Sequence, residues 1–308
     1  MKPLVVGTRG SALALAQAEM TEIALKERFP EREIIRKIIK TTGDRRTDVP
    51  LSQVAKAEGV LDKGVFTKEL ELALEAGEVD LAVHSMKDVP TVLADHFSVV
   101  GALKRAPVRD VLVCSDADSL EALPEGAVVA TSSVRRQRQL SWLRPDIKLV
   151  DIRGNVPTRL QKLRDNDELD AIMLAEAGLV RLGYDLGAEL DGGLHAVALA
   201  AAEFLPAAGQ GIVGFEIRKG DKDTQACIDA INHHESMLLL RAEREFLRLL
   251  DAGCHTPVGV RSWVEDESLC MAGRVFDEQS NDDPKESSVS GEMTEPEQVA
   301  SELYNTLK

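Results

Sequence analysis

The sequence has few aromatic residues, few cysteines and fewer basic than acidic side chains. Phe, Trp and Tyr together make up 4% of the 308 residues, which leaves little material for stacking on nucleic-acid bases. Lys and Arg number 37 against 52 Asp and Glu, a formal net charge of -15. Because nucleic acids and anionic membranes attract positive surfaces, this balance argues against both as general partners. No apolar run approaches the roughly 18 residues of a membrane helix.

The cysteines lie far apart, at Cys114, Cys227, Cys254 and Cys270. They form no Cys-x-x-Cys pair and have no histidine at zinc-ligand spacing, so we expect neither a disulfide framework nor a structural metal. The apolar run at 4–6 is too short for a signal peptide and is typical of a first strand. These features together predict a cytoplasmic protein that binds no metal and contacts no membrane.

The first two-thirds of the chain alternates short β-rich runs with helical patterns, which predicts parallel sheets with helices on both faces. Strands are expected at 3–7, 33–40, 80–84, 97–101, 111–114, 127–131, 147–151, 169–174 and 212–217. Helices are expected at 11–28, 66–77, 133–143, 155–165 and 175–183. Sites in such sheets lie at the carboxyl ends of strands, so the residues that follow each strand are candidates for function.

Two segments that contain Pro or Gly, 104–110 and 204–211, interrupt the periodic pattern and are candidate hinges. They predict two lobes around a cleft, with the strand at 212–217 returning to the first lobe. A smaller α+β domain follows. The expected boundaries are 1–103 with 206–221, then 104–205, then 222–308. Within the last part we expect helices at 222–231, 234–249 and 295–307, β-type runs around 257–264 and 269–276, and a polar loop at 277–292.

Charge is distributed unevenly along the chain. Residues 131–181 hold ten basic and seven acidic residues, a local balance of +3. Residues 264–302 hold two basic and twelve acidic residues, a balance of -10. The acidic excess therefore lies away from the middle of the chain.

Arginines and hydroxyl groups follow several of the predicted strands. One strand end supplies Thr131, Ser132, Ser133, Arg135 and Arg136, and others supply Arg9, Arg153, Arg159 and Arg181. Guanidinium groups and the free amides of a helix start bind carboxylates or phosphates. Because Arg is planar and bidentate, such a cluster suits several carboxylates better than one phosphate. For any single arginine, pairing with a surface carboxylate is the alternative.

A second constellation, His84 to Pro90, runs from an apolar strand into a turn that holds Ser85, Lys87 and Asp88. Lys87 beside Asp88 would keep this carboxylate ionised, and an ionised Asp in a cleft can stabilise a cation or accept a proton. From the residues alone, a turn in which Asp88 caps local amides is the commoner structure. His84 is expected to be a packed strand residue.

Cys254 lies in a turn of small residues after a long helix. A cysteine in a loop could be a nucleophile or an attachment point, whereas free cysteines are usually buried. His255 is adjacent in sequence, so its side chain need not face the sulfur. The polar stretch 43–62 is expected to form a lid or surface loop before Lys63 and Phe66. Flexibility alone could explain the glycines on either side of Gln210.

Together these motifs resemble the porphobilinogen deaminase family over almost the whole chain. The matching runs are Thr8 to Gln17, Lys63 to Glu71, His84 to Pro90, Thr131 to Gln137, Arg153 to Val156, Gly209 to Gly211 and Gly253 to His255. The chain departs from the common Gly-Gly-Cys pattern at Ala252, and from an Ile-Gly-Gly type sequence at 58–62. The resemblance implies an α/β fold with two periplasmic-binding-protein-like (type II) lobes around a cleft. It also implies a third domain that carries a dipyrromethane cofactor on a cysteine.

The resemblance further implies a transferase, hydroxymethylbilane synthase, in which Cys254 holds the dipyrromethane through a thioether. Four porphobilinogen molecules are joined head to tail on this primer with release of ammonia, and hydrolysis then yields hydroxymethylbilane. Asp88 would stabilise the azafulvene cation and relay a proton. The side chains implied in carboxylate binding are Arg9, Ser85, Lys87, Thr131, Ser132, Ser133, Arg135, Arg136, Arg153, Arg159 and Arg181. Those implied in the lid or hinge are Lys63, Phe66 and Gln210.

The same resemblance implies a monomer that passes its product to uroporphyrinogen-III synthase. Two other functions would be consistent with some of these sequence features. A non-catalytic two-lobed binding protein for an acidic metabolite would need the lobes and the arginines, but neither Cys254 nor a third domain. A nucleic-acid binder that uses the basic middle lobe would bind with a steep salt dependence.

Overall fold

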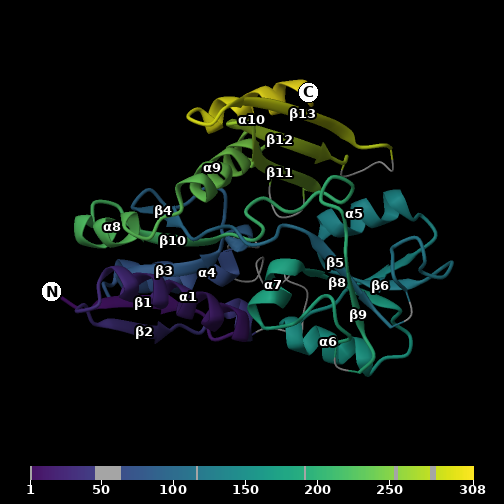
Figure 1. Ribbon diagram of the computed structural model, residues 1–308, viewed down its shortest axis with the longest axis horizontal. Helices are drawn as coiled ribbons and strands as arrows, with labels where there is room; N and C mark the ends of the chain where they lie inside the picture. Colours follow the sequence, from purple (N-terminus) through teal and green to yellow (C-terminus); the bar gives the residue numbers. More distant parts are fainter. Residues whose placement is uncertain (1, 46–63, 116, 191, 253–255, 278–281) are drawn as a thin grey trace.

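Three parts make up the protein, each with its own sheet (Figure 1). The computed structural model describes residues 2–45, 64–115, 117–190, 192–252, 256–277 and 282–308. Among these residues, no helix is both long and apolar enough to cross a membrane. The expected class, two α/β lobes and a smaller α+β domain, is confirmed.

The first lobe is a five-stranded sheet in the order β2-β1-β3-β10-β4. Strands β1, β2 and β3 are parallel, and β10 runs antiparallel between β3 and β4. Helices α1 and α8 bury Leu25, Cys227 and Ile228 against one face, and α4 buries Leu70 and Leu74 against the other. The elements are β1 (Leu4–Thr8), α1 (Ala12–Arg28), β2 (Ile34–Ile38), α2 (Thr42–Arg45), α4 (Gly64–Glu75), β3 (Leu81–Ser85), the 3₁₀ turn η1 (Met86–Asp88), β4 (Phe97–Ala102), β10 (Val213–Arg218) and α8 (Lys222–Asp229).

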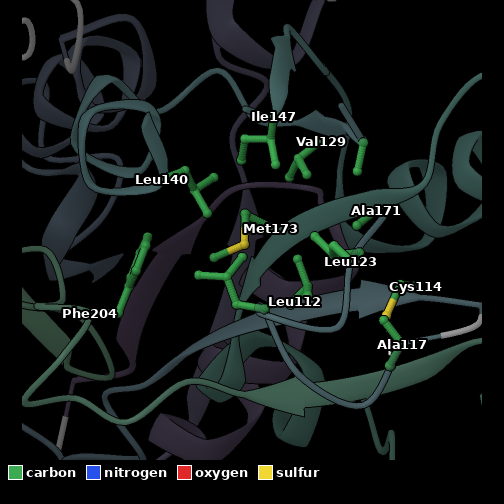
Figure 2. Packing of buried hydrophobic residues seen from close by; sticks show 12 residues of the cluster. Leu112, Cys114, Ala117, Leu123, Val129, Leu140, Ile147, Ala171, Met173 and Phe204 are labelled. Carbon is green, nitrogen blue, oxygen red and sulfur yellow. Dashed lines mark hydrogen bonds between the residues drawn. The ribbon is translucent and has the colours of Figure 1, made fainter. Parts of the chain in front are cut away.

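The second lobe has the order β7-β6-β8-β5-β9. Leu140 of α5 packs with Leu112, Met173 and Phe204 on one face of this sheet (Figure 2). On the other face lie apolar side chains of α6 and α7. The elements are β5 (Asp110–Cys114), β6 (Val128–Ala130), α5 (Val134–Leu143), β7 (Lys148–Val150), α6 (Val156–Arg164), β8 (Ala171–Ala175), α7 (Glu176–Arg181) and β9 (His195–Ala198). The sequence pattern missed β9.

The third part is an antiparallel sheet in the order β11-β12-β13, with α9 and α10 packed on it. Its elements are α9 (His234–Leu249), β11 (Val258–Glu265), β12 (Ser268–Val275), β13 (Lys285–Glu292) and α10 (Pro296–Thr306). The expectation of a loop over all of 277–292 is wrong, because β13 pairs with β12 along its whole length. Its polar side chains resemble a loop in sequence, but polar and charged residues are also typical of an edge strand.

Helix α8 contributes to the core of the first lobe, where Cys227 and Ile228 pack with Leu4, Leu81 and Phe215. Sequence alone placed this helix in the last domain, because it follows the returning strand at 212–217. The shared core leads us to propose that the first lobe extends to the end of α8.

A buried carboxylate joins the two hinge segments to the third part. Oε1 of Glu243 accepts hydrogen bonds from Nη1 of Arg105 at 2.7 Å and from the hydroxyl of Ser262 at 2.7 Å. Oε2 accepts from Nη2 of Arg105 at 3.1 Å and from the amide of Gly209 at 2.7 Å. The Glu243 side chain is 0% exposed and that of Arg105 is 8% exposed. One residue of α9 therefore binds both connections between the lobes.

The glycines beside Gln210 are required by the backbone and by close packing. Gly209 has φ 72° and Gly211 has φ 83°, both in the left-handed region. A Cβ at Gly211 would lie 2.4 Å from the carbonyl oxygen of Ala106, and one at Gly209 would lie 3.0 Å from the backbone of Met86. Flexibility alone does not explain these glycines, because any side chain would collide with the other hinge segment or with the turn after β3.

Glu243→Gln leaves the Arg105 guanidinium buried without its counter-charge. We expect the free energy of unfolding to fall by about 3–5 kcal/mol, as when one partner of a buried ion pair is removed. Urea unfolding followed by circular dichroism measures this loss.

Glu297→Gln is the matched control, because Glu297 pairs with Arg241 and both side chains are nearly half exposed. Its loss should stay below about 1 kcal/mol. Equal losses in the two variants would show that Glu243 is no more important than a surface ion pair.

Candidate active site

The turn after β3 is held by the core on both sides of its polar residues. Met86 and Val89 are buried, and the amide of Met86 donates to the carbonyl of Ile212 at 3.0 Å. Nε2 of Gln17 on α1 donates to Oγ of Ser85 at 2.7 Å. Because the apolar residues of the turn anchor it, the side chains of Lys87 and Asp88 remain half-buried at its surface.

Cationic side chains of the second lobe lie within electrostatic reach of this turn. Burial lowers the pKa of Lys87 to about 8, with the charge of Asp88 opposing the shift and that of Arg136 adding to it. Burial also lowers the pKa of Arg159 to about 10, with Arg136 and Arg153 adding to the shift and Asp88 opposing it. Asp88 of the first lobe therefore shares one electrostatic environment with Arg136 and Arg159 of the second.

Arg135 and Arg136 have a carboxylate partner inside the protein. Oδ2 of Asp110 accepts from Nη1 of Arg135 at 2.7 Å, and Oδ1 accepts from Nη2 of Arg136 at 2.6 Å. Burial alone would raise the pKa of Asp110, but the two guanidiniums outweigh it and hold that pKa well below its usual range. The guanidiniums also donate to the carbonyls of Leu205 and Met173. These two arginines thus have internal roles whether or not they meet a ligand.

The three hydroxyl groups before α5 are engaged in local hydrogen bonds. Oγ1 of Thr131, a fully buried residue, accepts from the amide of Ser133 at 3.3 Å. Oγ of Ser132 bonds to the backbone of Ile152 at 3.0 Å. Ser133 is the N-cap of α5 and accepts from the amide of Arg136. Together they fix the start of α5 and hold it to the chain after β7.

Arg153 and Arg159 lie at the start of α6. Asn155 caps this helix by accepting from the amide of Thr158 at 2.9 Å. Nε of Arg159 donates to the carbonyl of Gly154 at 2.8 Å, which sets the direction of its side chain. Within the described residues neither Lys87 nor Arg159 forms an ion pair, so both charges remain available to an anionic ligand.

Arg9 and Phe66 form a contact in the first lobe. Nη2 of Arg9 donates to Asp44 at 2.5 Å, and its guanidinium lies 4.2 Å from the centre of the Phe66 ring. Burial raises the pKa of Asp44, but Arg9 reverses the shift and lowers it overall. Phe66, expected in a lid or hinge, lies on α4. Lys63, the rest of the expected lid from 46 onward, Cys254 and His255 lie outside the described residues.

Arg181 lies on α7, where the second lobe meets the first. Its Nη2 donates to the carbonyl of Gly211 at 2.8 Å, while its buried Nε has no hydrogen-bond partner among the described residues. A Cβ at neighbouring Gly178 would lie 3.7 Å from Leu13 of α1, so α7 and α1 are in contact. Gln210 donates to the carbonyl of Val108 at 2.7 Å and so joins the two hinge segments.

Comparison with known proteins identifies the chain. Residues 4–226 match the family model "Porphobilinogen deaminase, dipyrromethane cofactor binding domain", and residues 237–308 match "Porphobilinogen deaminase, C-terminal domain". The chain belongs to the porphobilinogen deaminase family. The porphobilinogen deaminase of Moorella thermoacetica is 43% identical over 310 residues, covering 100% of this chain and 93% of that protein. That of Alkaliphilus metalliredigens is 41% identical, covering 100% and 92%.

The chain also resembles several solved structures. The VFT2 domain of Bordetella pertussis BvgS has a TM-score of 0.44 and 15% identity, covering 74% of this chain and 86% of that one. The periplasmic aliphatic sulphonate binding protein SsuA from Escherichia coli has a TM-score of 0.44 and 15% identity, covering 82% and 71%.

The charges around Asp88 fit the cofactor named in the family model. A dipyrromethane built from two porphobilinogen units carries two carboxylates on each ring. Lys87 and Arg159 offer unpaired positive charge, and the orphaned Nε of Arg181 is a buried donor without an acceptor. In the porphobilinogen deaminase fold these donors suit a polyanion better than a neutral ligand.

Several residues of the site escaped the sequence analysis. Asp110 holds Arg135 and Arg136, Gln17 holds Ser85, and Asp44 holds Arg9. Asp110 carries a signal, because a charged residue at the start of the apolar run 111–114 must find a partner if it is buried. The sequence around Gln17 and Asp44 gives no such signal, since polar residues in helices and loops are usually solvated.

Lys87 should titrate with a pKa of about 8 in the protein without bound ligand, since burial disfavours its charged form. In Asp88→Asn this pKa should fall further, because the carboxylate that opposes the shift is lost. NMR of protein labelled with 13C-lysine measures both values, and Lys87→Arg assigns the signal. An ordinary lysine pKa, near 10.5, would contradict the burial of this amine.

Proposed function

We propose that this chain is a hydroxymethylbilane synthase that joins four porphobilinogen molecules head to tail on a covalent dipyrromethane primer. Ammonia leaves at each addition, and hydrolysis finally releases hydroxymethylbilane. The observation that carries the proposal is the set of unpaired cations, Lys87 and Arg159, around Asp88 in a chain that matches the family along its whole length.

Binding is the first task of these residues. Each porphobilinogen unit brings an acetate and a propionate, so the product gains two carboxylates with each addition. Lys87 and Arg159 bind such groups by charge-assisted hydrogen bonds, and Arg153 and Arg181 extend the positive surface. Arg136 adds its charge from the ion pair with Asp110. Arg9 would have to exchange its contact with Asp44 for a ligand carboxylate.

Asp88 has the second task. When ammonia leaves the aminomethyl group of porphobilinogen, the remaining carbon and pyrrole ring carry positive charge. The ionised carboxylate of Asp88 stabilises that charge and accepts the proton released after the new carbon–carbon bond has formed.

The primer is held by Cys254 through a thioether, a role that this residue takes from the family resemblance. When bound, the dipyrromethane supplies the nucleophilic α-carbon of its terminal ring. Lys87, Arg159 and Arg181 would hold its carboxylates, with the hydroxyls near α5 supporting the backbone around them. Cys227 is buried in the core of the first lobe and Cys270 is buried on β12, so neither is placed for attachment.

The enzyme acts as a monomer in the cytoplasm and passes hydroxymethylbilane to uroporphyrinogen-III synthase. The buried thiols of Cys227 and Cys270 support a reducing compartment. Four additions at one Asp88 require either that the chain of pyrroles is drawn through the cleft or that the lobes shift about the segments 104–110 and 204–211, where Gln210 lies.

Intact-mass measurement tests the covalent primer. Protein purified from a host that makes porphobilinogen should be heavier than its sequence by two linked pyrrole units, and Cys254→Ala should lack this increment. Cys270→Ala is the control that should keep it. A bare sequence mass for the wild type would favour the non-catalytic binding protein instead.

Asp88→Asn tests the catalytic carboxylate. The amide has the same shape but no charge, so the fold should be retained while turnover falls by roughly 10²–10⁴-fold. A coupled assay of released ammonia measures this, and Asp95→Asn, an exposed change seven positions later, serves as the control. Near-normal ammonia release from Asp88→Asn would remove Asp88 from the mechanism.

A further inference from the structure

Glu216 is a buried carboxylate for which the proposed reaction has no use. It lies on β10, the strand between β3 and β4, and is 0% exposed. Nε2 of His84 donates to its Oε2 at 2.8 Å, and its Oε1 is buried without a hydrogen-bond partner in the part of the chain that the structure describes. Burying a charged group is costly unless it is well paired. The energetic cost of burying the Glu216 carboxylate therefore indicates that this side chain has a specific role.

His84 connects Glu216 to the start of the catalytic turn. It is the penultimate residue of β3 and faces Gly214 of β10 in the sheet register. The next residue, Ser85, accepts the hydrogen bond from Gln17, and Met86 to Asp88 form η1. Glu216 lies two residues beyond Gly214 on β10. Its hydrogen bond with His84 fixes the end of β3, where the turn begins.

Arg244 holds the end of the same turn. It lies on α9, and its Nη2 donates to the carbonyls of Pro90 at 2.7 Å and Thr91 at 2.9 Å. Burial lowers the pKa of Arg244 to about 10, and the charge of Glu216 opposes this shift. The guanidinium therefore fixes the chain just after Asp88, as the His84–Glu216 hydrogen bond fixes it before the turn.

Other titratable groups face Glu216 without reaching the turn. Glu71 projects from α4, and His96 comes just before β4. Burial and the charge of Glu216 raise the pKa of Glu71, while Thr67, His84 and His96 oppose the shift. Glu71 shares the electrostatic environment of Glu216, and among the described residues it forms no hydrogen bond or ion pair with residues 85–91, which makes it a suitable control.

We propose that Glu216 and Arg244 are positioning residues that fix the two ends of the segment 85–91, Glu216 through His84 at one end and Arg244 through the carbonyls of Pro90 and Thr91 at the other, and so set the place of Asp88. The inference rests on the proposed role of Asp88. Because Asp88 acts on charge that develops during the reaction, a displaced carboxylate lowers kcat more than it raises KM. Displacements of about 1 Å can lower the rate by about 100-fold.

The test uses Glu216→Gln, Arg244→Lys and the double variant in the primer-loaded enzyme. Each single change should lower kcat by about 10- to 100-fold with KM altered less than threefold. The double variant should lose less than the sum of the two single losses, because both changes displace the same segment. Glu71→Gln should keep kcat within about twofold. Additive losses, or a loss in Glu71→Gln equal to that in Glu216→Gln, would overturn the proposal.

Amide hydrogen exchange separates this proposal from the proposed function. Exchange in residues 85–91 should speed up at least tenfold in Glu216→Gln and Arg244→Lys, while exchange in β12 stays unchanged. Unchanged exchange at 85–91 would overturn the positioning role, whatever the activity. If Asp88→Asn stays active but exchange still rises in Glu216→Gln, the catalytic role fails and the positioning of the segment stands. Uniformly faster exchange would assign Glu216 to general stability and refute the proposal.

Discussion

The carboxylate of Glu243 is the interaction on which the arrangement of the three parts depends. It binds Arg105 on one connection between the lobes, Gly209 on the other, and Ser262 on β11. Because these bonds are buried, they are strong and cannot be exchanged for water. Both connections between the lobes are therefore bound by one residue of the third part. That residue lies on α9, whose Arg244 also holds the carbonyl of Pro90 at the end of the turn that contains Asp88. The connections and the segment around Asp88 are thus held by the same helix.

A second buried carboxylate explains how a protein of net charge -15 can keep a strongly positive site. Asp110 holds Arg135 and Arg136 side by side, where two bare guanidiniums would repel each other. The pair keeps one net positive charge within electrostatic reach of Lys87, whose pKa is lowered by burial, with Asp88 opposing the shift and Arg136 adding to it. The acidic residues of 264–302 belong to the third part and do not contribute to this set. The net charge of the whole chain therefore bears on solubility, whereas the local charge around Lys87 bears on which ligands bind.

Sequence reasoning located most elements of both lobes and the turn that holds Asp88, because apolar periodicity and strand ends are local signals. It failed where the deciding contact is distant or the pattern is polar. Strand β13 has no apolar alternation beyond Val289, so its pairing with β12 had no signal in its own residues. Arg135 and Arg136 pointed to a ligand in sequence, yet Asp110, 25 positions before Arg135, takes part of their hydrogen-bonding capacity. The packing that requires Gly211 comes from Ala106, on a different segment, and only the fold brings the two together.

The place of β10 in the first sheet has a consequence for how the chain acquires its structure. This strand comes from residues 213–218 but lies between β3 and β4, which end more than a hundred positions earlier. The second lobe, by contrast, takes all of its strands from the uninterrupted stretch between β5 and β9. During synthesis from the N-terminus, the sheet of the first lobe lacks β10, its strand between β3 and β4, until the second lobe has been synthesised. The lobe that is encoded second is thus the first that can be completed.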